Sequence, residues 1–168
     1  MSLTRRIALA ALGGLFLTAC ASTPDTPPDT TIYLVRHAEK EAGDNPPLTL
    51  IGRQRADILA QDLKDAGLTA IWSTDYRRTL ETAKPTAHMA NLPVQLYDPR
   101  DLPGFAATLK ATPGVMLVVG HSNTTPELVD LLGGDAGPAI DEATEYDRLY
   151  VVEIRGKRVT SELRRFGR

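Results

Sequence analysis

The sequence is poor in cysteine and has no excess of basic residues. Cys20 is the only cysteine among 168 residues, so the chain cannot form an internal disulfide and must be held together by packing. There are 19 lysines and arginines against 21 aspartates and glutamates, and this mildly acidic balance argues against a nucleic-acid partner. The remaining composition is that of an ordinary globular domain, because 42% hydrophobic residues are enough for one core.

Near its start the chain also lacks an apolar run long enough to cross a membrane. Arg5 and Arg6 precede an uncharged apolar run over residues 7–19, which is shorter than the roughly 20 residues of a spanning helix but fits a secretory signal. We therefore predict that residues 1–19 are a signal peptide and that the mature chain is exported. Without them the chain has 17 basic and 21 acidic residues, a net charge of −4.

The apolar run ends in the letters LTAC, which resemble the lipobox of bacterial lipoproteins. The resemblance implies that Cys20 becomes the acylated first residue of the mature chain. The domain would then be anchored by lipid to the bacterial cell envelope, outside the cytoplasm, and would contact the membrane only through that anchor. An ordinary buried or reactive thiol is the alternative. Residues 20–30 are rich in Pro and Thr, which predicts a stiff, solvated tether.

Residues 31–168 are predicted to form one α/β domain. Four short apolar runs recur along them, and helical patterns lie in between; the runs are TIYLV, AIWS, LPVQL and VMLVVG. This alternation predicts a parallel sheet covered by helices. The tail RLYVVEIRGKRVTSELRRF alternates in two halves around Gly156, which predicts a closing hairpin.

The first helical pattern follows Thr49, which is placed to cap it, and Gly67 is expected at the C′ position. One face of this helix carries Ala56, Leu59, Leu63 and Ala66.

Three more helices are expected. The second starts near Asp75 and should be broken or kinked at Pro85. The third covers about residues 104–111, and the fourth starts at Pro126, with this proline at position N1.

Histidine and arginine gather where the predicted strands end. His37 follows the first strand directly and His121 follows VMLVVG, while Arg77 and Arg78 follow the second strand at the start of a helix. In open α/β sheets ligands bind outside the carboxyl ends of the strands, so these side chains are expected at one rim. His88 lies near a helix end, where a cationic side chain suits a surface or capping position, and we leave it out of the site.

A cluster of histidine and arginine favours an anion over a metal ion. Arginine beside the histidines repels a divalent cation, whereas its planar donors match the oxygens of a phosphoryl group in paired hydrogen bonds. One imidazole would attack phosphorus in line while the other and two arginines surround the oxygens. Neighbouring positive charge favours the neutral imidazole that a nucleophile requires. We therefore expect neither a metal nor a cofactor.

Three motifs in order resemble the histidine phosphatase superfamily, also called phosphoglycerate-mutase-like: RHAEK after the first strand, RTLETA after the second and VGHSN after a late strand. The segment LTLIGRQRA is also similar to a helix of that family. The resemblance runs from about Thr31 to Leu132. It implies a three-layer α/β/α sandwich with a mostly parallel central sheet.

The resemblance also implies roles for individual residues. His37 would be the nucleophile that forms a phosphohistidine, with Arg36 beside it as a phosphate clamp. Arg78 rather than Arg77 would be the second clamp, because the family places its arginine four residues before TA. His121 would hydrogen-bond the transferring oxygens.

Ser122 and Asn123 are further candidate donors to the phosphate, and the chain departs from the family at two places. The usual RHG is RHA here, which adds only the methyl group of Ala38. The family often supplies a glutamate after the third strand as general acid, whereas this chain has LYDPRDLPG. Asp98 or Asp101 would be the acid, or each would simply cap a turn or the next helix.

The function that follows is a metal-independent phosphatase that hydrolyses a phosphomonoester or a phosphohistidine. Its partner would be a phosphorylated small molecule, or a phosphoryl group on a larger molecule, because the segment between the second arginine and the second histidine leaves little room for a lid. A phosphoglycerate-mutase-type phosphotransferase is one alternative. A noncatalytic lipoprotein that binds anions or partners is another, since fold alone does not fix function.

Overall fold

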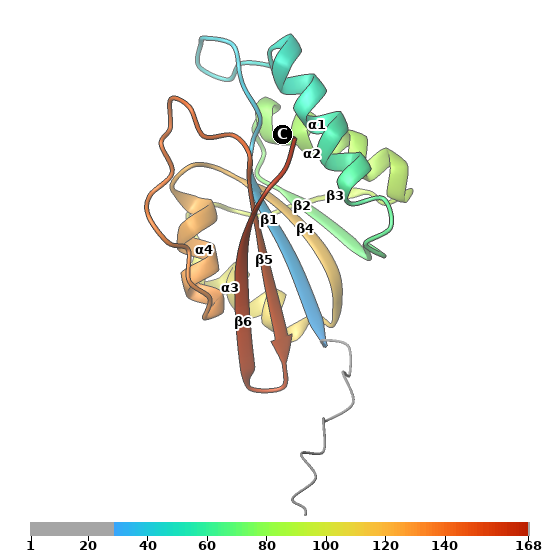
Figure 1. The fold of residues 1–168 in the computed structure, drawn as a ribbon, viewed down its shortest axis with the longest axis vertical. Coiled ribbons are helices and arrows are strands. Elements are labelled where there is room, and N and C mark those ends of the chain that lie inside the picture. The colour runs from blue at the N-terminus through green and yellow to red at the C-terminus, as the bar shows by residue number, and fades with distance from the viewer. Residues whose placement is uncertain (1–28, 168) are drawn as a thin grey trace, which may run out of the picture.

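The computed structural model describes residues 29–167, and within them the chain forms six strands and four helices. The elements alternate along most of the chain (Figure 1). Their bounds are β1 Thr30–Arg36, α1 Leu50–Asp62, β2 Ala70–Ser73, α2 Arg77–Ala90, β3 Val94–Leu96, α3 Leu102–Ala111, β4 Gly114–Gly120, α4 Thr124–Leu132, β5 Arg148–Arg155 and β6 Arg158–Arg165.

The strands form one sheet in the order β3-β2-β4-β1-β5-β6. Strands β3, β2, β4 and β1 are parallel neighbours, whereas β5 is antiparallel to β1 and β6 is antiparallel to β5. The mostly parallel sheet and the closing hairpin are therefore confirmed. Gly156 supplies the hairpin turn with a φ of 57°, a left-handed conformation that glycine adopts without a steric penalty.

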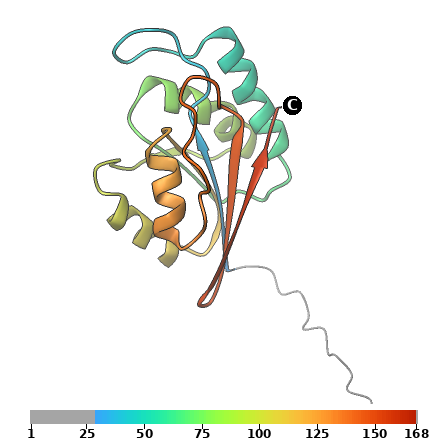
Figure 2. The ribbon, with the colours of Figure 1, turned by 60° about the vertical axis from the view of Figure 1, so that its left-hand side comes forward.

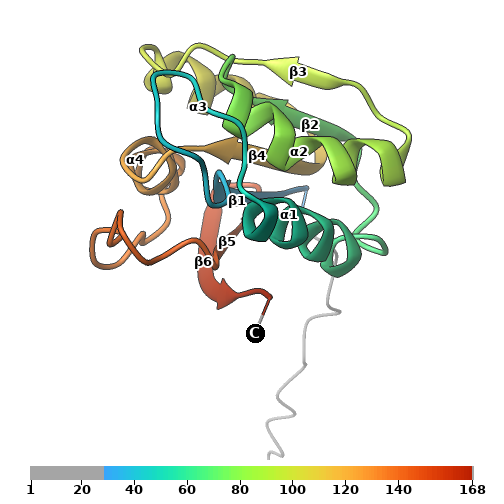
Figure 3. The same cartoon turned by 90° about the horizontal axis from the view of Figure 1, so that it is seen from above.

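Helices cover both faces of the sheet, so the predicted three-layer α/β/α sandwich is confirmed. Helices α1 and α2 lie on one face, and α3 and α4 lie on the other (Figure 3). Strand β1 alternates between them: Ile32 and Leu34 belong to the cluster under α3 and α4, and Val35 to the cluster under α1 and α2. This period of two is the pattern that a strand buried on both faces requires.

Helix α1 begins as predicted and ends earlier than predicted. The Thr49 hydroxyl accepts a hydrogen bond from the Gly52 amide at 3.0 Å, so the N-cap is confirmed. Gly67 as the C′ residue was wrong, because the helix ends at Asp62 with Leu63 as its C-cap. The amides of residues 64 and 66 bond to carbonyls three residues back, which tightens the chain into turns before Gly67 turns it away with a φ of 70°.

Helix α2 continues through Pro85, so of the predicted break or kink at this proline the break was wrong. Its buried face continues on both sides of the proline, with Thr82 and Ala83 before it and Thr86 and Ala87 after it. Packing of this face against the sheet offsets the one hydrogen bond that proline cannot donate.

Helices α3 and α4 each start two residues before the predicted position, at Leu102 and Thr124. Pro126 is therefore the third residue of α4 rather than the first. A proline in the first turn costs no hydrogen bond, since amides there have no partner within the helix. Gly133 follows α4 with a φ of 97°, in agreement with the glycine expected after its end.

The signal peptide, Cys20 and nearly all of the tether fall within residues 1–28, outside the described residues. Between residues 29 and 167 there is no helix with the length and apolar character to span a membrane. Strand β1 begins at one end of the domain and runs to the opposite end, where its carboxyl end meets those of β2 and β4 (Figures 1 and 2).

Candidate active site

The pairing of β1 with β4 brings the two histidines together. Arg36 and Gly120 are register partners and the last residues of their strands, and the His37 amide donates to the Gly120 carbonyl at 2.9 Å. A histidine directly follows each of these strands, and the ring centroids of His37 and His121 are 5.6 Å apart. A side chain at Gly120 would meet the Thr125 hydroxyl at 2.8 Å, so this close approach of elements requires glycine.

Helix α2 adds Arg78 to the pair of histidines. Its Nη2 lies 3.3 Å from His121 Nδ1, and its guanidinium stacks on the Tyr76 ring at 4.6 Å. Arg77 instead pairs with Glu81 at 2.9 Å on the surface. Helical geometry separates the two neighbours in this way, and it places Arg78, the arginine expected from the family pattern, in the site.

The surroundings of His37 hold its imidazole neutral. His37 as a whole residue is 3% exposed, and its Nδ1 donates to the Ala38 carbonyl at 2.8 Å, which leaves the Nε2 lone pair free. Burial lowers the pKa of His37 to about 3, and the charges of Arg36 and Arg78 contribute to the decrease. A neutral nitrogen with a free lone pair is the form that attacks phosphorus.

His121 is fixed by a chain of hydrogen bonds. Since arginine can only donate, Arg78 assigns the lone pair to His121 Nδ1, and the Nε2–H then donates to the Thr74 hydroxyl at 3.0 Å. The Thr74 hydroxyl in turn donates a hydrogen bond to the Thr79 hydroxyl at 3.0 Å. Burial, followed by the charges of Arg78 and Arg36, lowers the pKa of His121 to about 4.

Arg36 is buried and only partly satisfied. Its Nη1 donates to the Glu145 carbonyl at 3.0 Å, and its guanidinium stacks on the Tyr146 ring at 4.1 Å. Within the described part of the chain, its Nε and Nη2 have no hydrogen-bond partner, and the nearest carboxylate to Nη2 is that of Glu142, at 3.9 Å. Buried donors without partners are costly, and phosphoryl oxygens would satisfy them.

His37, Arg78 and His121 border a cavity of about 390 Å³, whereas the buried Arg36 is not among its lining residues. Its lining consists of His37, Lys40, Tyr76, Arg78, Pro99, His121, Ser122, Asn123, Thr124 and Glu142. Ser122 and Asn123, the additional donors expected from sequence, are thus at the site, and Asn123 is the N-cap residue of α4. The positive end of the α4 dipole adds to the attraction for an anion.

The two predicted candidates for the general acid lie outside this lining. Asp98 binds Arg100, whose hydrogen bonds lower the pKa of that carboxyl to about 2. Asp101 is the N-cap of α3 and accepts from the Gly104 amide at 3.0 Å. The structure therefore gives both aspartates the capping and turn contacts that were the alternative reading of the sequence.

Sequence reasoning missed the residues that the segment before β5 brings to the site. Glu142 lines the cavity and Tyr146 packs under Arg36, and neither has a local sequence motif. The signal that was available is the buried Arg148, since an arginine at the start of a predicted strand needs carboxylate or carbonyl partners.

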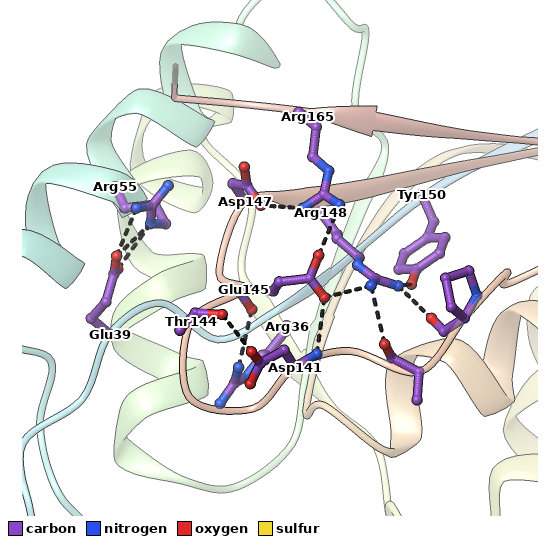
Figure 4. A network of polar contacts seen from close by, with 12 residues as sticks. Arg36, Glu39, Arg55, Asp141, Thr144, Glu145, Asp147, Arg148, Tyr150 and Arg165 are labelled. Atoms are coloured by element: carbon purple, nitrogen blue, oxygen red, sulfur yellow. Dashed lines mark hydrogen bonds and ion pairs between the residues drawn. The ribbon is translucent and has the colours of Figure 1, made fainter.

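Figure 4 shows how this segment is held. The Glu145 carboxylate binds Arg148 and Arg165, and Arg148 also donates to the carbonyls of Pro138 and Ala139. The hydrogen bond from Arg148 lowers the pKa of Glu145 to about 2. The same residue thus anchors the segment through its side chain and orients Arg36 through its carbonyl.

No group of three or more His, Cys, Asp or Glu side chains suited to a metal ion occurs among residues 29–167. The fold and the paired histidines with two arginines define an α/β protein with an anion site at the carboxyl ends of its parallel strands.

Comparisons with known proteins agree with this class. The model of the histidine phosphatase superfamily (branch 1) matches residues 32–99. A protein named "Probable phosphoglycerate mutase GpmB" from Yersinia pestis (strain Pestoides F) is 38% identical over an alignment of 77 residues, and the match covers 41% of this chain and 35% of the relative. The chain thus spans about a third of the length of the curated relatives that it matches.

Solved structures share the fold. The protein histidine phosphatase SixA in complex with tungstate has a TM-score of 0.62 at 16% identity, covering 81% of this chain and 95% of its own. Phosphoserine phosphatase from Entamoeba histolytica, in complex with 3-phosphoglyceric acid, has a TM-score of 0.58 at 15% identity, covering 83% and 97%. Residues 32–99 are thus similar to the histidine phosphatase superfamily (branch 1), and the solved structures show that the domain shares its fold with such phosphatases.

Proposed function

We propose that the protein is a metal-independent phosphatase that works through a phosphohistidine on His37. The observation that carries the proposal is the pair of neutral imidazoles 5.6 Å apart, His37 buried and His121 partly buried, with Arg36 and Arg78 beside them. Two fixed positive charges can neutralise a phosphoryl group while a neutral nitrogen attacks it. Inorganic phosphate is the expected product.

The reaction would proceed in two displacements. His37 Nε2 forms a bond to phosphorus while the bond to the leaving group breaks, and that group departs with the electron pair. A water molecule then attacks the phosphohistidine, the P–N bond breaks and phosphate leaves. Arg36 would bind the phosphoryl oxygens through its two unpartnered donors, and Arg78 through the face that now contacts His121.

The substrate would be a phosphorylated small molecule or a phosphoryl group on a larger molecule, such as a phosphohistidine. The cavity of about 390 Å³ supports this range because its rim is open, with Glu142 74% exposed. A mutase is the second candidate, favoured by the names of the curated relatives. The exposed rim argues against it, since a mutase must keep its phosphoenzyme away from water. A noncatalytic anion-binding role would use the same arginines without turnover.

The test is phosphate release from 4-nitrophenyl phosphate by the full chain in excess chelator. We expect the parent to turn over and His37→Ala to be inactive. Arg77→Ala is the matched control, because Arg77 pairs with Glu81 on the surface next to the site and should leave the rate unchanged. Label that stays on the protein in acid after reaction with a labelled phosphorylated substrate would contradict a phosphohistidine on this residue. An active His37→Ala protein would contradict it as well. Transfer of the label to an added alcohol rather than to water would favour the mutase.

We further propose that the protein is exported and anchored through Cys20. The signal-like residues 1–19 and the LTAC letters support this, and nothing in residues 29–167 bears on it. Because β1 begins at the end of the domain opposite the site, the cavity of an anchored protein would open away from the membrane. Membrane fractionation of cells that express the parent and Cys20→Ala tests the anchor. The parent should sediment with membranes and the variant should not.

A further inference from the structure

Cleavage of an alkyl phosphomonoester needs a proton donor, and the expected donors are occupied. An alkoxide is a poor leaving group, so a positioned acid must protonate the bridging oxygen as its bond to phosphorus breaks. Asp98 is held as a carboxylate by Arg100, and Asp101 caps α3. A site that processes alkyl esters must therefore take its acid from elsewhere.

Glu142 is the carboxylate that the structure places at the site. Of the described residues that line the cavity, it is the only one with a carboxyl group. Its Oε1 lies 3.9 Å from Arg36 Nη2, one of the two buried donors that have no hydrogen-bond partner and that would bind phosphoryl oxygens. A group bound by Arg36 would therefore lie next to this carboxyl.

The exposed fractions of His37 and Glu142 fit a nucleophile and an acid that act on opposite sides of a bound phosphoryl group. His37 is 3% exposed and forms the floor of the cavity, whereas the Glu142 side chain is 74% exposed and forms part of its rim. In-line attack from the floor pushes the leaving oxygen toward the rim. The nucleophile and the acid thus stand on opposite sides of the reacting group, as protonation of a leaving oxygen requires.

We propose that Glu142 is the general acid of this site and that alkyl phosphomonoesters are among its substrates. This inference rests on the proposed function of His37. The Glu142 carboxyl gives its proton to the bridging oxygen as the P–O bond breaks, so the products are an alcohol, a carboxylate and the phosphohistidine. In the second displacement the carboxylate takes a proton from the attacking water, and this restores the starting state.

Glu142 lies next to cationic side chains and on an ordered stretch of backbone. Its Oε1 is 3.9 Å from Arg36 Nη2, and Lys40 lines the same cavity. The backbone at Glu142 is held nearby, since the Asp141 amide donates to the Glu145 carboxylate at 2.9 Å.

The experiment compares two esters in the full chain, glycerol 2-phosphate and 4-nitrophenyl phosphate, for the parent and Glu142→Gln. The second ester has a leaving group that needs no proton. We expect kcat/KM of the variant to fall about 100-fold for the alkyl ester and less than about threefold for the aryl ester. The basic limb of the pH profile should also disappear for the alkyl ester alone. Asp98→Asn is the matched control and should leave both rates unchanged.

Several outcomes would overturn the assignment of Glu142. These are an unchanged alkyl rate in Glu142→Gln, an equal loss on both esters, or a parent that does not cleave the alkyl ester at all. In each case aryl hydrolysis that still depends on His37 would leave the proposed function intact. Aryl hydrolysis that survives His37→Ala would instead overturn the proposed function and this inference with it. Glu142→Asp, which keeps the acid on a shorter stem, should recover part of the alkyl rate if the proposal is correct.

Discussion

Two neutral histidines, one buried and one partly buried, make the folded protein sensitive to mild acid. In the folded state the pKa of His37 is about 3 and that of His121 is about 4, whereas both are expected near 6.5 in the unfolded chain. Between these values the unfolded chain binds more protons than the folded one. Stability is therefore fully present above pH 6.5 and is lost as the pH falls toward the folded-state values.

The size of this loss follows from the two shifts. A group with an unfolded pKa of 6.5 that stays neutral when folded costs about 2 kcal/mol between about pH 8 and about pH 5. His37 and His121 together should lower the free energy of unfolding by at most about 4 kcal/mol, the value for imidazoles that stay neutral in the folded protein. A domain of this size has a total of about 5 to 15 kcal/mol, so the loss is a large part of its stability.

Urea unfolding followed by circular dichroism at about pH 8 and about pH 5 measures the loss, and ordinary carboxylates contribute little in this window. The variants His37→Gln and His121→Gln should each lose about 2 kcal/mol less than the parent over the same interval. A parent whose stability changes by less than about 1 kcal/mol would show that the imidazoles take up protons in the folded state, and the reasoning about a neutral nucleophile would then be wrong.

Three further changes test the surroundings of the site. Gly52→Ala would place a Cβ 2.1 Å from the backbone oxygen of Glu39, so we expect a loss of about 1 to 3 kcal/mol in urea unfolding, and an unchanged midpoint would show that α1 can move away. Thr74→Val removes the acceptor of His121 Nε2–H, which should lower kcat about tenfold and move the acid limb of the pH profile, whereas a purely structural role would leave that limb in place. Arg148→Met leaves buried carbonyls without donors and should cost about 2 to 4 kcal/mol with a raised KM, and thermal unfolding together with substrate titration checks both.

The sequence was sufficient for the sheet and for the floor of the site. Strand runs and the two histidines that follow them are local patterns, and parallel pairing then brings His37 and His121 together without further information. Arg78 was separated from Arg77 by a short motif, and helical geometry places the two side chains as the motif implies.

Helix ends were less well predicted, because tertiary packing decides them. Pro85 does not break α2, since the buried face of that helix packs on the sheet before and after it. Gly67 does not cap α1, since the chain tightens into turns several residues earlier. In both cases a local preference that costs one hydrogen bond is weaker than the burial of a helix face.

The rim of the site was not predicted, because no periodic pattern marks the segment between α4 and β5 and Arg148 alone does not say which residues it binds. Its shape depends on Arg148, which reaches two backbone carbonyls, and on Glu145, which binds two arginines. These contacts join residues that the sequence presents as separate surface charges. Glu142 and Tyr146 become site residues only after this network has formed.

The two parts of the site are therefore built by different means, and this separates their effects on the reaction. The floor is fixed by backbone pairing, since the amide of His37 bonds to the carbonyl of Gly120 at 2.9 Å. The rim is fixed by side-chain contacts of Glu145, whose own carbonyl holds Arg36. In the mechanism that we propose, changes at the floor should abolish formation of the phosphohistidine, whatever the substrate. Changes at the rim should alter which leaving groups the site accepts while the nucleophile remains in place, because the chemistry of the leaving oxygen occurs on that side of phosphorus.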